Sequence, residues 1–165
     1  MSFYAFLKVE GIPGESTDSK HTNEIEVLSF NHHMSQAGGA ATSRTGGHTG
    51  GTRADIGDFS ITKVLDKASP NLAKYCASGK HIPSVVLSLS SPNDKAHTYM
   101  KYTLTNALVS GLRPGGSSSA EGTRPLEEVS FRFSKIEWEY TPFDDKGAAG
   151  GAIKAGWDMS KNEAV

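Results

Sequence analysis

Cysteine is almost absent from this sequence of 165 residues, because Cys76 is the only one. A single thiol excludes a disulfide within the chain and a zinc site built from cysteines, and a lone cysteine is most often a small core residue. Lys and Arg together number 17 against 18 for Asp and Glu, which gives a formal net charge of -1. No excess of either sign draws the chain to nucleic acid or to anionic lipid.

Long apolar runs are also missing. The first residues lack the basic segment, apolar stretch and small-residue cleavage site of a secretory signal peptide, and no later segment is apolar enough to span a bilayer. We therefore expect no membrane insertion and a cytoplasmic protein. If it leaves the cell, it uses a route other than a signal peptide.

The common catalytic and metal-binding motifs are absent. His32 and His33 are adjacent, so on a strand they point to opposite faces and cannot share a metal. The glycines of residues 46–51 lack the Gly-Lys-Ser/Thr ending of a phosphate loop, and Asp144 with Asp145 form a pair that is usually solvated. We expect no catalytic residue, no metal site and no cofactor.

Strand patterns dominate what is present. Apolar or aromatic residues recur with the strand period in six segments, which are residues 3–9, 24–31, 59–65, 83–90, 98–108 and 126–140. Only one helix is expected, at about residues 69–78. The sequence predicts a single domain over residues 1–165 that is mainly β: an antiparallel β-sandwich or flattened β-barrel with one short α-helix.

The expected helix has both end signals. Ser69–Pro70 pairs a residue that can cap free amides with one that fits the first helical position. Leu72, Tyr75 and Cys76 follow at the spacing of a buried stripe, and Gly79 provides the stop.

The segment 126–140 changes its apolar face partway. Val129 and Phe131 share one phase of the alternation, whereas Ile136 and Trp138 occupy the other, and the change falls near Ser134. A shift of one residue turns every side chain over, so the pattern predicts a bulge or a strand that leaves one sheet for a second.

The connecting segments are polar or rich in glycine. The connection of residues 15–23 is expected at the surface, without a residue able to anchor a core. Residues 113–120 are expected to be a flexible linker, and residues 144–155 a Gly/Ala-rich tail that Trp157 pins by packing. In the segment 59–65, Lys63 is the exception on an apolar face.

In the second strand segment, Leu28 and Phe30 alternate with Ser29 and Asn31, which predicts one buried face and one small polar face. Two explanations stay open at this point. The polar face is either the solvent-exposed side of an ordinary antiparallel sheet or a wall of a water-filled channel.

Several segments together resemble the Hcp family, the tube proteins of bacterial type VI secretion systems. They are residues 11–16 (GIPGES), His21, residues 26–30 (EVLSF), 69–72 (SPNL), 76–81 (CASGKH), 129–138 (VSFRFSKIEW) and 156–158 (GWD). The matches run in order from end to end, so the resemblance covers the whole chain.

This resemblance implies homohexameric rings that stack into a tube, which a contractile sheath encloses and expels with the spike protein VgrG from a baseplate. It implies secretion without a signal peptide, small effector proteins in the lumen, and a lumen wall to which Ser29 and Asn31 contribute. The Gly-rich segment 36–55, with Arg44, His48 and Arg53, would be the loop that contacts the next ring, and its composition predicts mobility in the free protein.

Two other functions remain as alternatives. A secreted β-sandwich that binds carbohydrate or a cell surface would be favoured by aromatic clusters in the loops, but these loops are rich in Gly, Ser and Thr. A toxin enzyme fused to an Hcp-like domain would need further sequence after Trp157, and we expect none.

Overall fold

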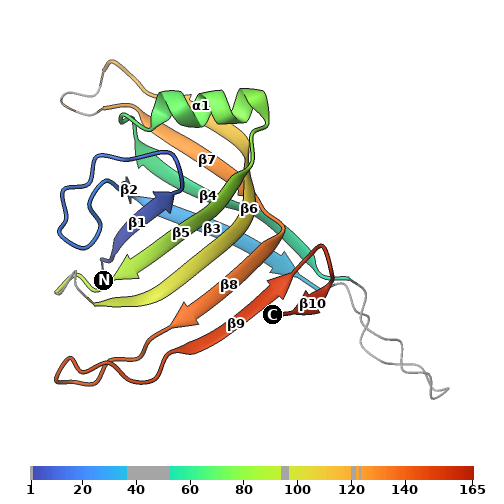
Figure 1. Cartoon of the computed structure of the whole chain (residues 1–165). Coiled ribbons are helices and arrows are strands. Elements are labelled where there is room, and N and C mark those ends of the chain that lie inside the picture. The colour runs from blue at the N-terminus through green and yellow to red at the C-terminus, as the bar shows by residue number, and fades with distance from the viewer. Residues whose placement is uncertain (1, 37–52, 94–96, 120–121, 123) are drawn as a thin grey trace.

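The structure is a computed structural model that describes residues 2–36, 53–93, 97–119, 122 and 124–165. Ten strands and one helix, α1 (Ser69–Ser78), are assigned within these residues (Figure 1). The strands are β1 (Tyr4–Val9), β2 (Ile25–Val27), β3 (Ser29–Ser35), β4 (Asp55–Val64), β5 (Ile82–Ser90), β6 (Thr98–Gly115), β7 (Leu126–Arg132), β8 (Lys135–Tyr140), β9 (Ile153–Asp158) and β10 (Glu163–Ala164). The prediction of a mainly β chain with a helix at 69–78 is confirmed.

The strands form two antiparallel sheets that share β6. Sheet A has the order β10-β9-β8-β6-β5-β1-β2, and sheet B has the order β3-β4-β7-β6. The first part of β6 pairs with β5 and β8, and its part from Leu108 onward pairs with β7. β6 therefore joins the sheets along one corner, and the β2–β3 segment joins them along another.

The change of sheet predicted near Ser134 is confirmed. β7 lies in sheet B and β8 in sheet A, and Ser134 lies between them. The backbone amide of Ser134 donates to the carbonyl of Thr105 at 3.1 Å, which fixes the crossing against β6. Val129 and Ile136 are both fully buried, because the odd-numbered residues of β7 and the even-numbered residues of β8 face the shared core.

The core fills the space between the sheets, and the aromatic rings of Phe30, Phe59 and Tyr102 stack or tilt against one another inside it. Apolar side chains from both sheets and from α1 complete it. The largest that are fully buried are Phe59, Phe131, Leu7, Ile12, Ile25, Ile61, Leu72, Ile82, Leu87, Leu104 and Ile136.

The prediction that Leu28 is buried with Phe30 is wrong, because Leu28 is 55% exposed. Leu28 lies at the point where the chain leaves β2 for β3, and its amide donates to the carbonyl of Thr62 at 2.8 Å. Leu28 and Ser29 are consecutive exposed residues, so the alternation of faces slips by one residue at this crossing.

Helix α1 ends as predicted but begins differently. Gly79 has a left-handed φ of 66° and donates its amide to the carbonyl of Tyr75, which is the expected glycine stop. Ala68, not Ser69, is the N-cap residue, and no side-chain hydrogen bond caps the helix. The Ser69 hydroxyl instead donates to Glu127 Oε2 at 2.8 Å and accepts from the Asp66 amide at 3.1 Å.

Lys63 is the centre of a buried polar cluster beside the start of α1. Its side chain has no exposed surface, and its Nζ lies 2.9 Å from Glu127 Oε2, 2.9 Å from Asp66 Oδ1 and 3.0 Å from Ser69 Oγ. We call Lys63, Asp66, Ser69 and Glu127 the Lys63 cluster. It ties β4, β7 and the start of α1 together, which explains the charged exception on an apolar strand face.

The connection between β1 and β2 packs more closely than predicted. Ser16 and His21 are buried, and the His21 ring stacks on Phe6 with the centroids 4.3 Å apart. The prediction that this segment holds no anchoring residue is wrong, because a histidine ring provides a flat packing surface when a partner satisfies one of its nitrogens. Here Glu24 Oε2 lies 2.8 Å from His21 Nδ1.

Gly14 is predicted to be sensitive to substitution. A Cβ added there would lie 2.3 Å from the carbonyl oxygen of Glu24, and backbone atoms cannot easily move away. We expect Gly14→Ala to lower the free energy of unfolding by about 1–3 kcal/mol, measured by urea denaturation. Gly115→Ala is the control, because nothing lies within 4 Å of its added Cβ. Equal stability of the two variants would contradict the prediction.

Two expected loops are partly strands. β6 continues through Arg113 to Gly115, where the prediction placed the start of a flexible linker. Pro114 is tolerated because β6 is the edge strand of sheet B at this end, and backbone pairing with β7 orders the segment. Likewise β9 begins at Ile153, inside the expected Gly/Ala-rich tail, because it pairs with β8.

Candidate functional site

The outer face of sheet B carries small polar side chains. Ser29 and Asn31 are exposed on β3, and their partners across the strand pair are Thr62 and Ser60 of β4. Ser60 is in turn opposite Ser130 of β7, and the two hydroxyls lie 2.9 Å apart. We call these five residues the hydroxyl face. The structure thus places both residues predicted to face a channel on one surface.

Charged groups of both signs border the hydroxyl face. Asp58 accepts a hydrogen bond from Ser110 at 2.6 Å and lies 3.4 Å from the Nε of Arg132. Arg113 and Glu128 are opposite each other across β6 and β7. Short hydroxyl and amide side chains keep a surface hydrated, and paired charges leave it without a dominant sign. Such a face can border water without adhering strongly to apolar groups.

Sequence reasoning did not assign Ser60, Thr62 and Ser130 to this surface, although a signal was available. Ser60 and Thr62 alternate with the buried Phe59 and Ile61 along β4. Ser130 occupies the same kind of position in β7. The alternation alone indicated which residues face outward, but only the strand order shows that they lie beside Ser29 and Asn31.

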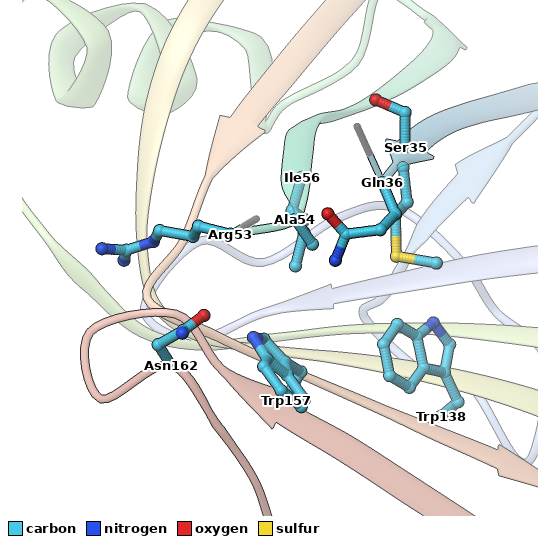
Figure 2. A pocket seen from close by; sticks show the side chains of 9 residues that line it. Ser35, Gln36, Arg53, Ala54, Ile56, Trp138, Trp157 and Asn162 are labelled. Carbon is cyan, nitrogen blue, oxygen red and sulfur yellow. The ribbon is translucent and has the colours of Figure 1, made fainter. Parts of the chain in front are cut away.

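A second surface is an apolar cleft of 520 Å³ between the end of β3, the start of β4 and the strands β8 and β9. Figure 2 shows the indole rings of Trp138 and Trp157 on one side and Ile56 with Ala54 on the other. Met34 also lines the cleft and is 48% exposed. Trp157 packs partly against the core, in agreement with its expected role as a packing anchor.

The cleft exists because the core-facing side of sheet A continues beyond the cover that sheet B provides. Along β8, Ile136 is fully buried, Trp138 is half-buried and Tyr140 is 47% exposed. Ile153 of β9 is opposite Tyr140 and is 67% exposed. An apolar surface of this kind, continuous with the core, is typical of a contact with another protein.

The residues predicted to form a ring-stacking loop are only partly described. Arg53 lies at the cleft, where its guanidinium donates to the carbonyl of Met159. Arg44 and His48 lie outside the described residues, as does most of the segment 36–55 that was expected to be mobile.

Among the open strand edges of the described residues, those of β3 and β9 border the candidate surfaces. β3 pairs with β4 alone, and β10 covers β9 only at Trp157 and Asp158. The start of β9, from Ile153, has β8 on one side and no named strand on the other. Unpaired backbone groups along such edges can bind a further strand.

The histidine pair of β3 does not form a metal site. His32 stacks on Phe59, its Nε2 lies 3.1 Å from the Gly57 carbonyl oxygen, and burial lowers the pKa of its imidazole. His33 is exposed. Across the described ranges, no group of three His, Cys, Asp or Glu side chains could hold a metal ion. Nor does any helix among them have the length and apolar character needed to cross a bilayer.

Comparisons with known proteins agree with one another. Residues 6–140 match the family described as "Type VI secretion system effector, Hcp". The chain is 35% identical to the protein hcp1 of Pseudomonas aeruginosa over 164 residues, which is 98% of each chain. It resembles the crystal structure of Hcp1 from Salmonella typhimurium, with a TM-score of 0.79, 38% identity and full coverage of both chains. It also resembles a structure described as a type six secretion system protein, with a TM-score of 0.90, 31% identity, and coverage of 99% of this chain and 100% of the other.

Proposed function

This chain belongs to the Hcp family, which makes it a subunit of the type VI secretion tube, and on that premise we propose that six copies close into a ring that carries small effector proteins. The observation that carries the proposal is a pair of unlike surfaces at opposite ends of one hairpin. The apolar cleft that includes Met34 lies where β3 ends and β4 begins. At the other end the exposed Leu28 lies beside Val64 and Leu65, in a surface that also carries the charged side chains of Glu15, Glu26, Asp66 and Arg124.

Unlike surfaces at opposite ends of a hairpin favour head-to-tail association. If Leu28 and its apolar neighbours Val64 and Leu65 insert into the cleft of the next copy, each subunit uses its Leu28 surface for one neighbour and its cleft for the other. A fixed rotation at every contact then closes a ring. The open edges of β3 and β9 would let the sheets continue from one subunit to the next. The family sets the expected number of subunits at six.

The hydroxyl face is the surface we assign to the lumen. A channel that holds folded proteins and then releases them requires a wall that stays hydrated, and Ser29, Asn31 and their neighbours on β4 and β7 form such a wall. The paired charges beside it avoid a strong attraction to cargo of either sign. We assign Arg53 and the loop that follows residue 36 to contacts between stacked rings.

The mechanism in this proposal is assembly and mechanical delivery, and it involves no catalysis. The rings stack into a tube in the cytoplasm, the sheath and baseplate enclose and anchor it, and the tube leaves the cell behind the VgrG spike. Stacking contacts must be weaker than the contacts within a ring, because the tube has to form only where the machine builds it.

Native mass spectrometry tests the proposed assembly. On dilution in moderate salt, we expect intact hexamers and dissociation of any stacked rings. Monomers under these conditions, or a ring with a different number of subunits, would contradict the proposal.

A further inference from the structure

A polar cavity of 380 Å³ lies on the outer face of sheet A, away from the hydroxyl face. Lys8 of β1 and Lys101 of β6 stand on either side of β5, and Lys20 reaches the cavity from the connection between β1 and β2. In Figure 1 this connection lies beside β1, at the edge of the sheet. Val86, Ser88 and Thr98 also line the cavity from β5 and β6, and the rest of the lining is His21 and Glu24.

The three lysine side chains are free of ion pairs within the described part of the chain. Lys154, by contrast, lies 3.5 Å from Glu139 on the same sheet, and Lys63 is fully paired. The one acid that lines the cavity, Glu24, is held 2.8 Å from His21 Nδ1. Three lysines against one glutamate give the cavity an excess of positive charge, although the whole chain is nearly neutral.

A buried polar atom at the same place lacks a partner. His21 is only 6% exposed, its ring is fixed by the stack on Phe6, and its Nδ1 is occupied by Glu24. Its Nε2 is buried without any hydrogen bond. A buried nitrogen is rarely left unsatisfied, and this one belongs to a residue that lines the cavity.

We propose that this cavity binds the carboxylates of an acidic segment on a partner protein. Lysine ammonium groups act as separate point charges, and the three here come from three different chain segments around one cavity. That arrangement suits several carboxylates along an extended chain better than one compact anion, for which a bidentate arginine or a cluster of backbone amides is typical. The cavity and the hydroxyl face are on different sheets, so both can be occupied together.

Titration with a short fluorescent peptide of alternating Asp and Ser tests this proposal. We expect saturable binding to the wild-type protein, measured by fluorescence anisotropy at low salt, and no binding of a peptide in which Asn replaces Asp. The double variant Lys8→Gln/Lys101→Gln should bind the acidic peptide about tenfold more weakly. The matched control is Lys74→Gln/Lys161→Gln, which removes the same charge from exposed positions elsewhere and should bind like the wild type.

Three outcomes would overturn the proposal. They are the absence of saturable binding, an equal loss of affinity in the control variant, and displacement of the peptide by inorganic phosphate at a similar concentration, which would assign the cavity to small anions. Light scattering on the same samples records the oligomeric state. A failure of peptide binding with intact rings is therefore distinct from a failure of the proposed assembly.

Discussion

Replacing Lys63 with methionine is expected to lower the free energy of unfolding by about 3–5 kcal/mol, because it leaves a buried carboxylate without its cation. The Glu127 side chain is only 2% exposed, and its Oε2 lies 2.9 Å from Lys63 Nζ. After the substitution, the Ser69 hydroxyl is the one remaining hydrogen-bond donor to that oxygen in the Lys63 cluster. A methionine fills much of the volume of the lysine stem, so the loss reports on charge more than on packing.

A double-mutant cycle measured by urea denaturation checks this result. Lys63→Met/Glu127→Leu, compared with both single variants, should recover the part of the loss that comes from Glu127, because no charge is then left at that buried position. Asp66 stays charged, but it is 11% exposed and still accepts from the Ala68 amide at 2.9 Å. Lys154→Met serves as the comparison. It breaks an exposed pair with Glu139, so the free energy of unfolding should change by no more than about 1 kcal/mol. A Lys63→Met protein as stable as the Lys154→Met protein would show that the cluster contributes little.

Met34→Asp is expected to convert rings into folded monomers. Met34 is already 48% exposed in the isolated chain, so an aspartate there costs the monomer little. In the proposed ring, the same side chain would bury a carboxylate among Trp138, Trp157 and Leu28 of the neighbour, and Arg53, the cation in the cleft lining, already donates to the Met159 carbonyl. The loss should weaken each contact by about 2–5 kcal/mol, which is enough to dissociate the ring at micromolar concentration. Size-exclusion chromatography with light scattering measures the change.

Leu28→Asp should have the same effect from the other side of the contact, and mixing the two variants provides the sharpest test. Met34→Asp keeps its surface around Leu28, and Leu28→Asp keeps its cleft. The mixture should therefore form dimers joined by one intact contact, and no larger species. Ala73→Asp, on the exposed side of α1, is the control and should stay a ring. Hexamers of folded Met34→Asp protein would refute the assignment of the cleft.

Much of the fold could be predicted from local pattern. Strand alternation located the larger strands, and the change of phase in residues 126–140 identified the passage from sheet B to sheet A. Gly79 marked the end of α1 because only a left-handed residue closes the helix there. These features depend on neighbouring residues, so the sequence carries them directly.

Features that depend on distant segments could not be predicted in the same way. Lys63 was recognisable as an exception, but its main partner, Glu127, lies on β7, and only strand pairing brings the two together. The exposure of Leu28 follows from a crossing between sheets. The strand β9 is weak in its own sequence and is ordered by pairing with β8.

The same difference between local features and features that depend on distant segments applies to the candidate surfaces. Alternation and family resemblance predicted that Ser29 and Asn31 line a channel, and the structure places further small polar residues beside them. The cleft depends on side chains from four strands and on how far sheet A extends beyond the part that sheet B covers. No pattern in one segment indicates that relation.

The pairing of β4 with β7 also sets an order of events during synthesis. β4 leaves the ribosome long before β7, because α1, β5 and β6 lie between them in the chain. Until β7 is synthesised, β4 has an unpaired edge in its hairpin with β3. Lys63 also lacks its ion-pair partner Glu127 during this time. Closing so long a segment is slow compared with forming a hairpin. The newly made chain thus passes through a stage in which the free edge of β4 is open to wrong pairing, and this edge is covered only when β7 pairs with it.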